Sequence, residues 1–480
     1  MPGQILVGTL IDAPTHDALR VRTNHVCVVG PNGRIAVIKP VDPATHDPVQ
    51  TEEAIRSSVP KEYQELPLYL MGEHEFLCPG MVDCHNHAPQ YHQIGTATDY
   101  TLFDWLFNVT FPNEAKCQDL VYAKDLYTRL VQRLLRSGTT SAQFFATNHI
   151  APTKLLVEIC AAQGLRGFVG LVTADQHSPD YYVQTTEEAL RLTEEFITWT
   201  HAHEFGREKR GPEDALVHPV ITPRFVPTCS LDLLNGLGAL MKKYDVRVQS
   251  HAAETVDQVL RVKEMHPSIG GGRDVAIFEQ VGLLGSRTTL AHCTHMRDYE
   301  VRKMAAVGSA VSACPIANMI HSRSVVPVPR YKALGVKLGL GTDIAGGYSA
   351  SMLGPLRTAI FDDRTDSFVK VEREDKPLDQ YTDPDPKTEW PVGHVWAYHL
   401  ATVGGAEALG ISDHSGSLDV GKHFDAILVD NNRPEEKGGQ AFEWWPGETP
   451  EIRFERWINT GDERNVARVW VAGRLVVGRS

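Results

Sequence analysis

The sequence predicts an α/β fold: a (β/α)8 barrel of the TIM type, joined to a small β-sandwich domain built from both chain ends. From residue 76 to residue 411, short apolar runs of strand length alternate with longer helical patterns. Both chain ends show β patterns outside that region. A barrel of this class takes about 250 residues or more, so 480 residues leave room for a second domain. The predicted division is 1–75, 76–411 and 412–480, with the first and last parts forming the small domain.

The barrel prediction depends on eight candidate strands that have helical segments between them. They cover residues 76–83, 139–145, 166–173, 217–222, 246–250, 288–291, 310–313 and 337–341. Parallel strands need crossover connections of this kind. A doubly wound open sheet is the structural alternative, but it would more often carry a glycine-rich nucleotide loop, and we find no such loop in the sequence.

The clearest helix lies between the first two candidate strands. Its apolar residues recur at steps of three and four, and Gly138 follows as a stop signal. This apolar stripe consists of Ala123, Leu126, Tyr127, Leu130, Val131, Leu134 and Leu135. Two segments lack such periodicity. We expect 41–70 to be an irregular surface connection and 364–392 to be a solvated loop.

The chain ends alternate apolar runs with turn residues, which is typical of β structure. We therefore expect the two ends to pair into one small domain outside the barrel. The predicted strands cover residues 5–10, 25–29, 34–38 and 425–430, and 466–477 reads as a hairpin that turns near Gly473.

Composition excludes several classes of function. The formal net charge of −13 argues against general binding of nucleic acid or an anionic membrane. We find no apolar run of transmembrane length and no signal-peptide pattern. The eight cysteines contain no CxxC pair, which favours free thiols in a reducing compartment. The sequence therefore predicts a soluble cytoplasmic protein that acts on a small molecule.

The ends of four candidate strands carry residues that bind metals or move protons. His85 and His87 are two residues apart, so on a strand they point to the same side and can bind one metal ion together. Each residue alone is a weak signal, because a strand-end histidine is usually structural and an aspartate after Gly-Thr is usually a turn or a cap. All these ends meet at one mouth of a barrel, where such enzymes have their active sites. The other strand-end residues are His251 with Glu254, then His292, and then Asp343.

Longer stretches show that the chain resembles the amidohydrolase superfamily, and within it the guanine deaminase family. The resemblance covers nearly the whole chain. HAPQY (87–91), TPRF (222–225) and GTDIAGGYS (341–349) are more specific than the metal ligands, which the whole superfamily shares. The other stretches are PGMVDCHNH (79–87), DWLFNVTFPNE (104–114), SGTTSAQFFAT (137–147), QSHAAE (249–254) and GSLDVGKHFDAILVD (416–430).

The resemblance implies one catalytic zinc ion with four protein ligands: His85, His87, His251 and Asp343. Three imidazoles and a carboxylate suit Zn²⁺, although iron would accept the same set. The resemblance also implies three catalytic roles. Glu254 would carry a proton from water to the substrate ring, His292 would hold that water, and Asp343 would help to move a proton to the departing amine. The alternative for Glu254 is an acidic residue in the first turn of a helix.

The resemblance further implies that Gln90, Arg224 and Phe225 hold a purine, and that a cytoplasmic homodimer deaminates guanine to xanthine and ammonia in purine breakdown. Arg224 can donate to the C6 carbonyl, Gln90 can donate and accept, and an aromatic ring can stack on the base. Without the resemblance, we would interpret Arg224 as one member of a surface ion pair and Phe225 as a residue of the hydrophobic core. Trp105 and its neighbours Phe107 and Phe111 either close over the base or pack a helix on the barrel.

Two departures from the family pattern bear on substrate preference rather than on reaction class. Ala317 stands in a Cys-Pro-Ile-Ala-Asn stretch where the family has serine, and His295 is an additional histidine. Two other interpretations stay open. One is a relative that deaminates or dechlorinates a pterin or a triazine, and the other is a scaffold with this fold and no metal.

Overall fold

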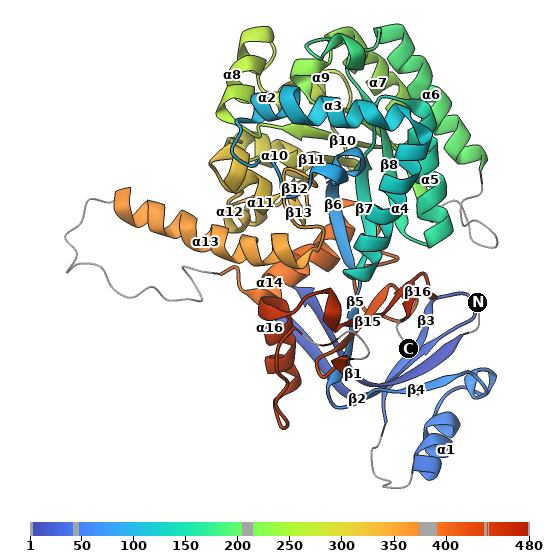
Figure 1. Cartoon of the computed structure of the whole chain (residues 1–480). Helices are drawn as coiled ribbons and strands as arrows, with labels where there is room; N and C mark the ends of the chain where they lie inside the picture. The colour runs from blue at the N-terminus through green and yellow to red at the C-terminus, as the bar shows by residue number, and fades with distance from the viewer. Residues whose placement is uncertain are drawn as a thin grey trace.

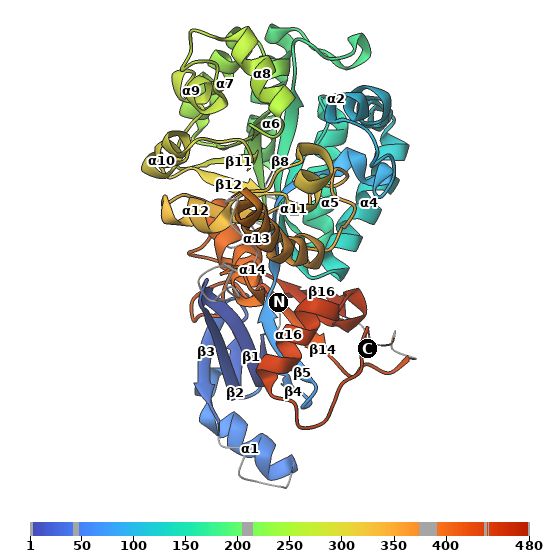
Figure 2. The same cartoon turned by 90° about the vertical axis from the view of Figure 1, so that its left-hand side faces the viewer.

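The computed structural model describes residues 3–41, 48–203, 215–373, 391–435, 439 and 441–478. A barrel with helices around it lies above a smaller β-sheet, and the two chain ends lie with the sheet (Figure 1). Figure 2 shows the same two parts from the side, with helix α14 (His394–His399) at their junction. The predicted fold class is therefore confirmed.

The barrel consists of eight parallel strands that pair in chain order. They are β6 (Met81–His87), β7 (Thr139–Phe145), β8 (Arg166–Thr173), β9 (Val217–Pro223), β10 (Arg247–Ala252), β11 (Thr288–His292), β12 (Ala310–Ala313) and β13 (Lys337–Leu340). Nearly every residue of these strands is buried, because side chains fill the barrel and helices cover it.

Helices connect consecutive strands of the barrel. The longest of those between β6 and β13 include α4 (Leu120–Arg136), α5 (Ile150–Gln163), α6 (Thr186–Ala202), α7 (Leu231–Tyr244), α8 (Val256–Met265) and α10 (Asp298–Val307). Asp119 caps α4 by accepting from the Val121 backbone N–H at 2.8 Å. The buried face of α4 consists of the seven residues of the predicted apolar stripe. Gly138, just after this helix, has a φ of 88°, which favours glycine.

The first and last strands of the barrel meet through loop hydrogen bonds at the mouth. The Asp343 backbone N–H donates to the His85 carbonyl at 2.9 Å, and the His87 N–H donates to the Ile344 carbonyl at 3.0 Å. Gly341 permits this approach, because a Cβ there would lie 2.7 Å from the His85 Cβ. The ends of β6 and β13 are thereby held side by side.

The small domain is one mixed sheet that both chain ends build. Its strands are β1 (Gln4–Thr15), β2 (Ala18–Val29), β3 (Ile35–Pro40), β5 (Glu75–Pro79), β14 (Ala426–Asp430), β15 (Val466–Val471) and β16 (Arg474–Gly478), and β4 (Leu68–Leu70) pairs with β1. β5 joins the two halves, since it pairs with β1 on one side and with β14 on the other. Arg166 at the start of β8 reaches Asp425 at 3.1 Å, so a buried ion pair links this sheet to the barrel.

Three predicted segments differ from the structure. The strand expected over 76–83 is two strands, because Gly80 separates β5 of the small sheet from β6 of the barrel. The connection at 41–70 is partly regular, with helix α1 (Pro48–Ser58) and strand β4, and 42–47 lie outside the described residues. Helix α13 (Leu353–Arg373) extends into the loop expected at 364–392, of which 374–390 lie outside the described residues. Composition alone suggested solvation there and did not reveal the helix.

All eight cysteines lie in the described part of the chain, where they are buried and form no disulfide. Within the same residues, no helix combines the length and the apolar character that crossing a membrane would require.

Candidate active site at the barrel mouth

The strand-end residues that the sequence singled out converge at the mouth of the barrel. His85 Nε2 lies 3.1 Å from Asp343 Oδ1, and His87 Nε2 lies 3.5 Å from the same oxygen. His251 Nε2 is 3.0 Å from His87 Nε2. His292 Nε2 is 3.7 Å from Glu254 Oε1 and 3.9 Å from Asp343 Oδ2. The structure therefore brings all six residues together around one point.

Asp83 fixes the relation between the first and last strands at this point. Its carboxylate is fully buried and accepts from the Thr342 backbone N–H at 2.9 Å, the Thr342 hydroxyl at 2.6 Å and the Asn86 amide at 3.0 Å. These bonds link the residues next to His85 and Asp343 on the two strands. The sequence reasoning did not assign a role to Asp83.

Two of the imidazoles use one ring nitrogen for a hydrogen bond to a group outside the cluster. His251 Nδ1 lies 2.5 Å from the Arg224 carbonyl oxygen, and His292 Nδ1 lies 2.9 Å from Asn318 Oδ1. Both oxygens are acceptors, so Nδ1 carries the proton in each ring and Nε2 offers a lone pair toward the cluster. A second contact of this kind orients metal-binding histidines in proteins.

The residues present fit a divalent cation. Burial lowers the pKa of His85, His87 and His251 well below the usual value, so these imidazoles are neutral and their lone pairs are free. His85 Nε2 is buried and finds no hydrogen-bond partner among the residues that the structure describes. Burial also raises the pKa of Asp343 to about 6, although the neighbouring His292, His321 and Arg224 lower it. Neutral imidazoles and a carboxylate that meet at one point are a donor set that suits a metal ion.

Glu254 stands beside the cluster, just before helix α8. Its side chain is buried, and burial raises its pKa to about 7, although nearby His292 lowers it. A carboxyl group with such a pKa exchanges protons readily near neutral pH, which suits a general acid–base group. Thr255 is the N-cap of α8 and accepts from the Gln258 N–H at 3.1 Å. Glu254 therefore precedes the cap and is not a first-turn acid.

A short helical segment covers the mouth from the side of the first strand. It consists of α2 (Leu102–Trp105), the π-helical turn η3 (Leu106–Thr110) and α3 (Phe111–Ala115). Trp105 is buried and lines the cavity above the cluster, together with Gln90, Arg224 and Phe225. The cavity has a free volume of about 30 Å³, which is room for a water molecule. A flat base is larger, so the cover segment or the side chains under it must shift to admit one.

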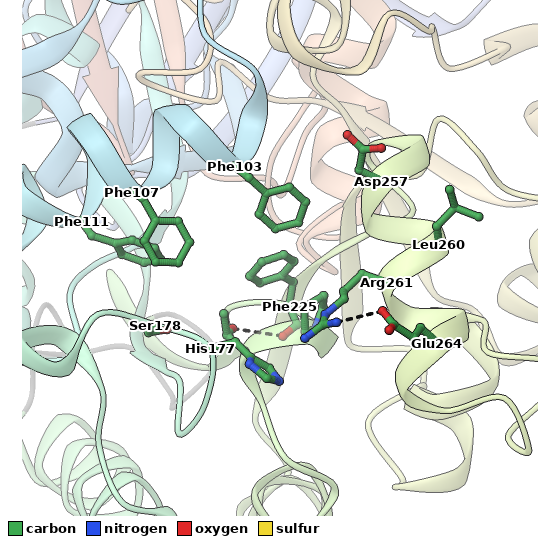
Figure 3. A pocket seen from close by; sticks show the side chains of 12 residues that line it. Phe103, Phe107, Phe111, His177, Ser178, Phe225, Asp257, Leu260, Arg261 and Glu264 are labelled. Atoms are coloured by element: carbon green, nitrogen blue, oxygen red, sulfur yellow. Dashed lines mark hydrogen bonds and ion pairs between the residues drawn. The ribbon is translucent and has the colours of Figure 1, made fainter.

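The structure separates the three aromatic residues whose role the sequence left open. Trp105 faces the cavity, whereas Phe107 and Phe111 line a groove of about 550 Å³ on the other side of the cover segment. Figure 3 shows this groove, with Phe103, Phe107 and Phe111 above Phe225 and the Arg261–Glu264 ion pair on α8 opposite. Phe225 lines both the groove and the cavity, so it lies between them.

Arg224 is held by a buried acidic residue that the sequence reasoning missed. Its Nη1 and Nη2 donate to the two carboxylate oxygens of Glu114 at 2.8 Å and 3.1 Å, and its guanidinium lies over the Phe111 ring. The Gln90 amide donates to Glu114 Oε1 at 2.8 Å and accepts from the Ala345 N–H at 3.0 Å. Glu114 thus ties both proposed base-binding side chains to the cover segment.

We predict that Glu114→Gln lowers kcat/KM for the base that the resemblance implies by about tenfold to a hundredfold, mainly through KM. A charged hydrogen bond contributes about 1.5–3 kcal/mol, and its loss would leave Arg224 and Gln90 less firmly oriented. Steady-state kinetics measures the effect, and metal content should stay unchanged. Asp425→Asn is the matched control, because it breaks the buried ion pair with Arg166 in the small domain. This control should lower thermal stability without changing KM, and an equal rise in KM would contradict the role of Glu114.

The other residues that the sequence reasoning missed surround this centre. Leu102, Leu106, His321 and Gly346 also line the cavity. The Phe145 ring packs against the rings of His85, His87 and His251 at 4.6–5.0 Å between centroids. Glu114 is the last residue of the stretch 104–114, and Phe145 lies within the stretch 137–147. Both stretches belong to the resemblance, which was the available signal for these two residues. His295, the additional histidine, is half-buried outside the cavity lining.

Comparisons with known proteins agree with this geometry. The amidohydrolase family model matches residues 76–476. A guanine deaminase of Dictyostelium discoideum is 36% identical over 405 residues, which cover 84% of this chain and 82% of the relative. A probable guanine deaminase of Schizosaccharomyces pombe is 34% identical over 478 residues, which cover 99% of this chain and 83% of the relative. The crystal structure of guanine deaminase from C. acetobutylicum with bound guanine has a TM-score of 0.81 and 30% identity, and covers 99% of this chain and 100% of that chain. The chain therefore belongs to the amidohydrolase family and, within it, to the guanine deaminases.

Proposed function

We propose that this chain hydrolyses guanine to xanthine and ammonia, with one zinc ion held by His85, His87, His251 and Asp343. One observation carries the proposal: a cluster of residues able to hold a metal ion lies at a cavity whose wall presents Arg224, fixed by buried Glu114. When bound, such an ion activates a water molecule for attack near neutral pH.

The protein residues supply orientation and proton transfer. Arg224 donates to the C6 carbonyl of the base with N–H groups that Glu114 does not use, since a guanidinium has five. Gln90 keeps one amide N–H for the base. Phe225 and Trp105 face the flat ring, and the cover segment, which carries Trp105, excludes water.

Glu254 takes a proton from the attacking water and gives it to a ring nitrogen beside C2. His292 accepts a hydrogen bond from that water through Nε2, because its Nδ1 is bound to Asn318. As the new C2–O bond forms and the C2–N bond breaks, Asp343 receives a proton from the attacking oxygen and passes it to the leaving amine. Ammonia and xanthine are the products.

The test incubates the purified protein separately with each member of a panel of compounds: guanine, adenine, a pterin, a triazine and cytosine. Ammonia release and the absorbance of xanthine report turnover. We expect guanine to be the best substrate and adenine a poor one, because Arg224 has no acceptor for an amine at C6. Turnover of a pterin or a triazine without turnover of guanine would overturn the substrate assignment, and inactivity with metal bound would favour a scaffold.

The cytoplasmic location, the role in purine breakdown and the homodimer that the resemblance implies stay predictions. Light scattering on the purified protein measures the mass of the assembly and tests the homodimer directly.

A further inference from the structure

His321 is a cavity residue that the proposed mechanism does not use. It lies in the π-helical turn η8 (Asn318–Ser322) that follows β12, and its ring is 5.1 Å from the Trp105 ring between centroids. It lines the same cavity as Arg224, Glu254 and Asp343. A polar ring in the wall of this cavity is expected to meet either water or a base that the cavity opens to admit.

One ring nitrogen of His321 is an acceptor without a partner among the described residues. Nδ1 is buried, and the described part of the chain gives it no hydrogen-bond partner. Burial lowers the pKa of His321, and a hydrogen bond from the ring to the backbone of Tyr100 opposes this shift, so the ring donates and a carbonyl accepts. The donor is then Nε2, and Nδ1 carries a lone pair in the neutral ring. An unpaired buried acceptor is costly, and a donor on a ligand would relieve that cost.

The position of this acceptor in the ring of strands indicates which part of the base it meets. Arg224 follows β9, the fourth strand of the barrel, and His321 follows β12, the seventh, so they come from opposite halves of the mouth. In guanine, C2 lies between N1, which leads to the C6 carbonyl, and N3, which leads to N9. With C2 at the metal-ligand cluster and the carbonyl at Arg224, the N3–N9 edge faces the other half of the mouth.

We propose that His321 is a specificity-determining residue whose Nδ1 accepts a hydrogen bond from the N9–H of the base. The proposal rests on the proposed function, since it assumes that guanine is the substrate. It explains how the site would recognise the free base, because a nucleoside carries a sugar at N9 in place of this hydrogen. A purine with a substituent at N9 would lose the bond and would press against the His321 ring.

The test compares guanine with 9-deazaguanine, which has the same shape but carries C–H at position 9. His321→Phe keeps a ring against Trp105 and removes the acceptor. We expect this variant to lower kcat/KM for guanine by about tenfold, as for one buried hydrogen bond with its partner left unpaired. The same substitution should leave kcat/KM for 9-deazaguanine little changed, because that base has no N–H at position 9 to lose.

Controls separate this effect from damage to the site. Met319→Ala changes an exposed residue of the same turn and should affect both bases equally little. Metal content and melting temperature show whether His321→Phe folds, and His321→Leu, which also removes the acceptor, serves if it does not. An equal loss on both bases, or no loss on guanine, would overturn the role of His321. Wild-type protein that binds metal and fails to deaminate guanine would instead overturn the proposed function.

Discussion

Glu254→Gln is expected to lower the turnover of guanine by roughly 10²–10⁴-fold while the metal stays bound. Glutamine keeps the size of the side chain but cannot take a proton from water and return it to the ring. The carboxyl group is buried beside His292, where burial raises its pKa to about 7. The proton that it must carry is therefore neither too tightly nor too weakly held. The measurement is kcat at saturating guanine, with metal content determined on the same preparation.

A matched control for this variant is Glu264→Gln on helix α8, whose carboxylate forms an exposed ion pair with Arg261. Exposed pairs of this kind contribute about 0–1 kcal/mol to stability, so turnover should not change. If Glu254→Gln keeps near wild-type activity with metal bound, Glu254 is only a residue at the entry of α8 and another group carries the proton.

The barrel and the cluster of histidines and acidic residues at its mouth could be predicted because local sequence determines them. Buried parallel strands read as short apolar runs, and the residue after each run must lie at the mouth. His251, His292 and Asp343 therefore came together without any knowledge of packing. The split of 76–83 into two strands could not be predicted in this way, since both halves are equally apolar and only their partners differ.

The substrate side of the cavity depends on tertiary contacts that a sequence does not display. Glu114 looks like a surface acid in a helix, yet it is fully buried because Arg224, 110 residues later, neutralises it. Trp105, Phe107 and Phe111 have the same apolar character, and only the direction of the cover segment places the first in the cavity and the other two in the groove. His321 gave no signal at all, because an isolated histidine after a strand usually has a structural role.

The second large effect is expected for metal binding. Wild-type protein should contain about one zinc-like ion per chain, and His87→Ala should lose most of it together with activity. His85 and His87 lie two residues apart in β6, and the Nε2 atom of each lies within 3.5 Å of Asp343 Oδ1. Removing one member of this pair leaves three of the four proposed metal ligands.

Elemental analysis of protein purified without added metal measures the ion and also distinguishes zinc from iron. His149→Ala is the control, because it removes a half-buried imidazole away from the cluster and should leave the metal content unchanged. A chelator should lower the melting temperature of the wild type, since an ion that binds only the folded state stabilises it by mass action. The same chelator should have little further effect on His87→Ala. An active wild-type preparation that contains no metal would contradict this assignment, because turnover would then not depend on an ion held by these imidazoles and Asp343.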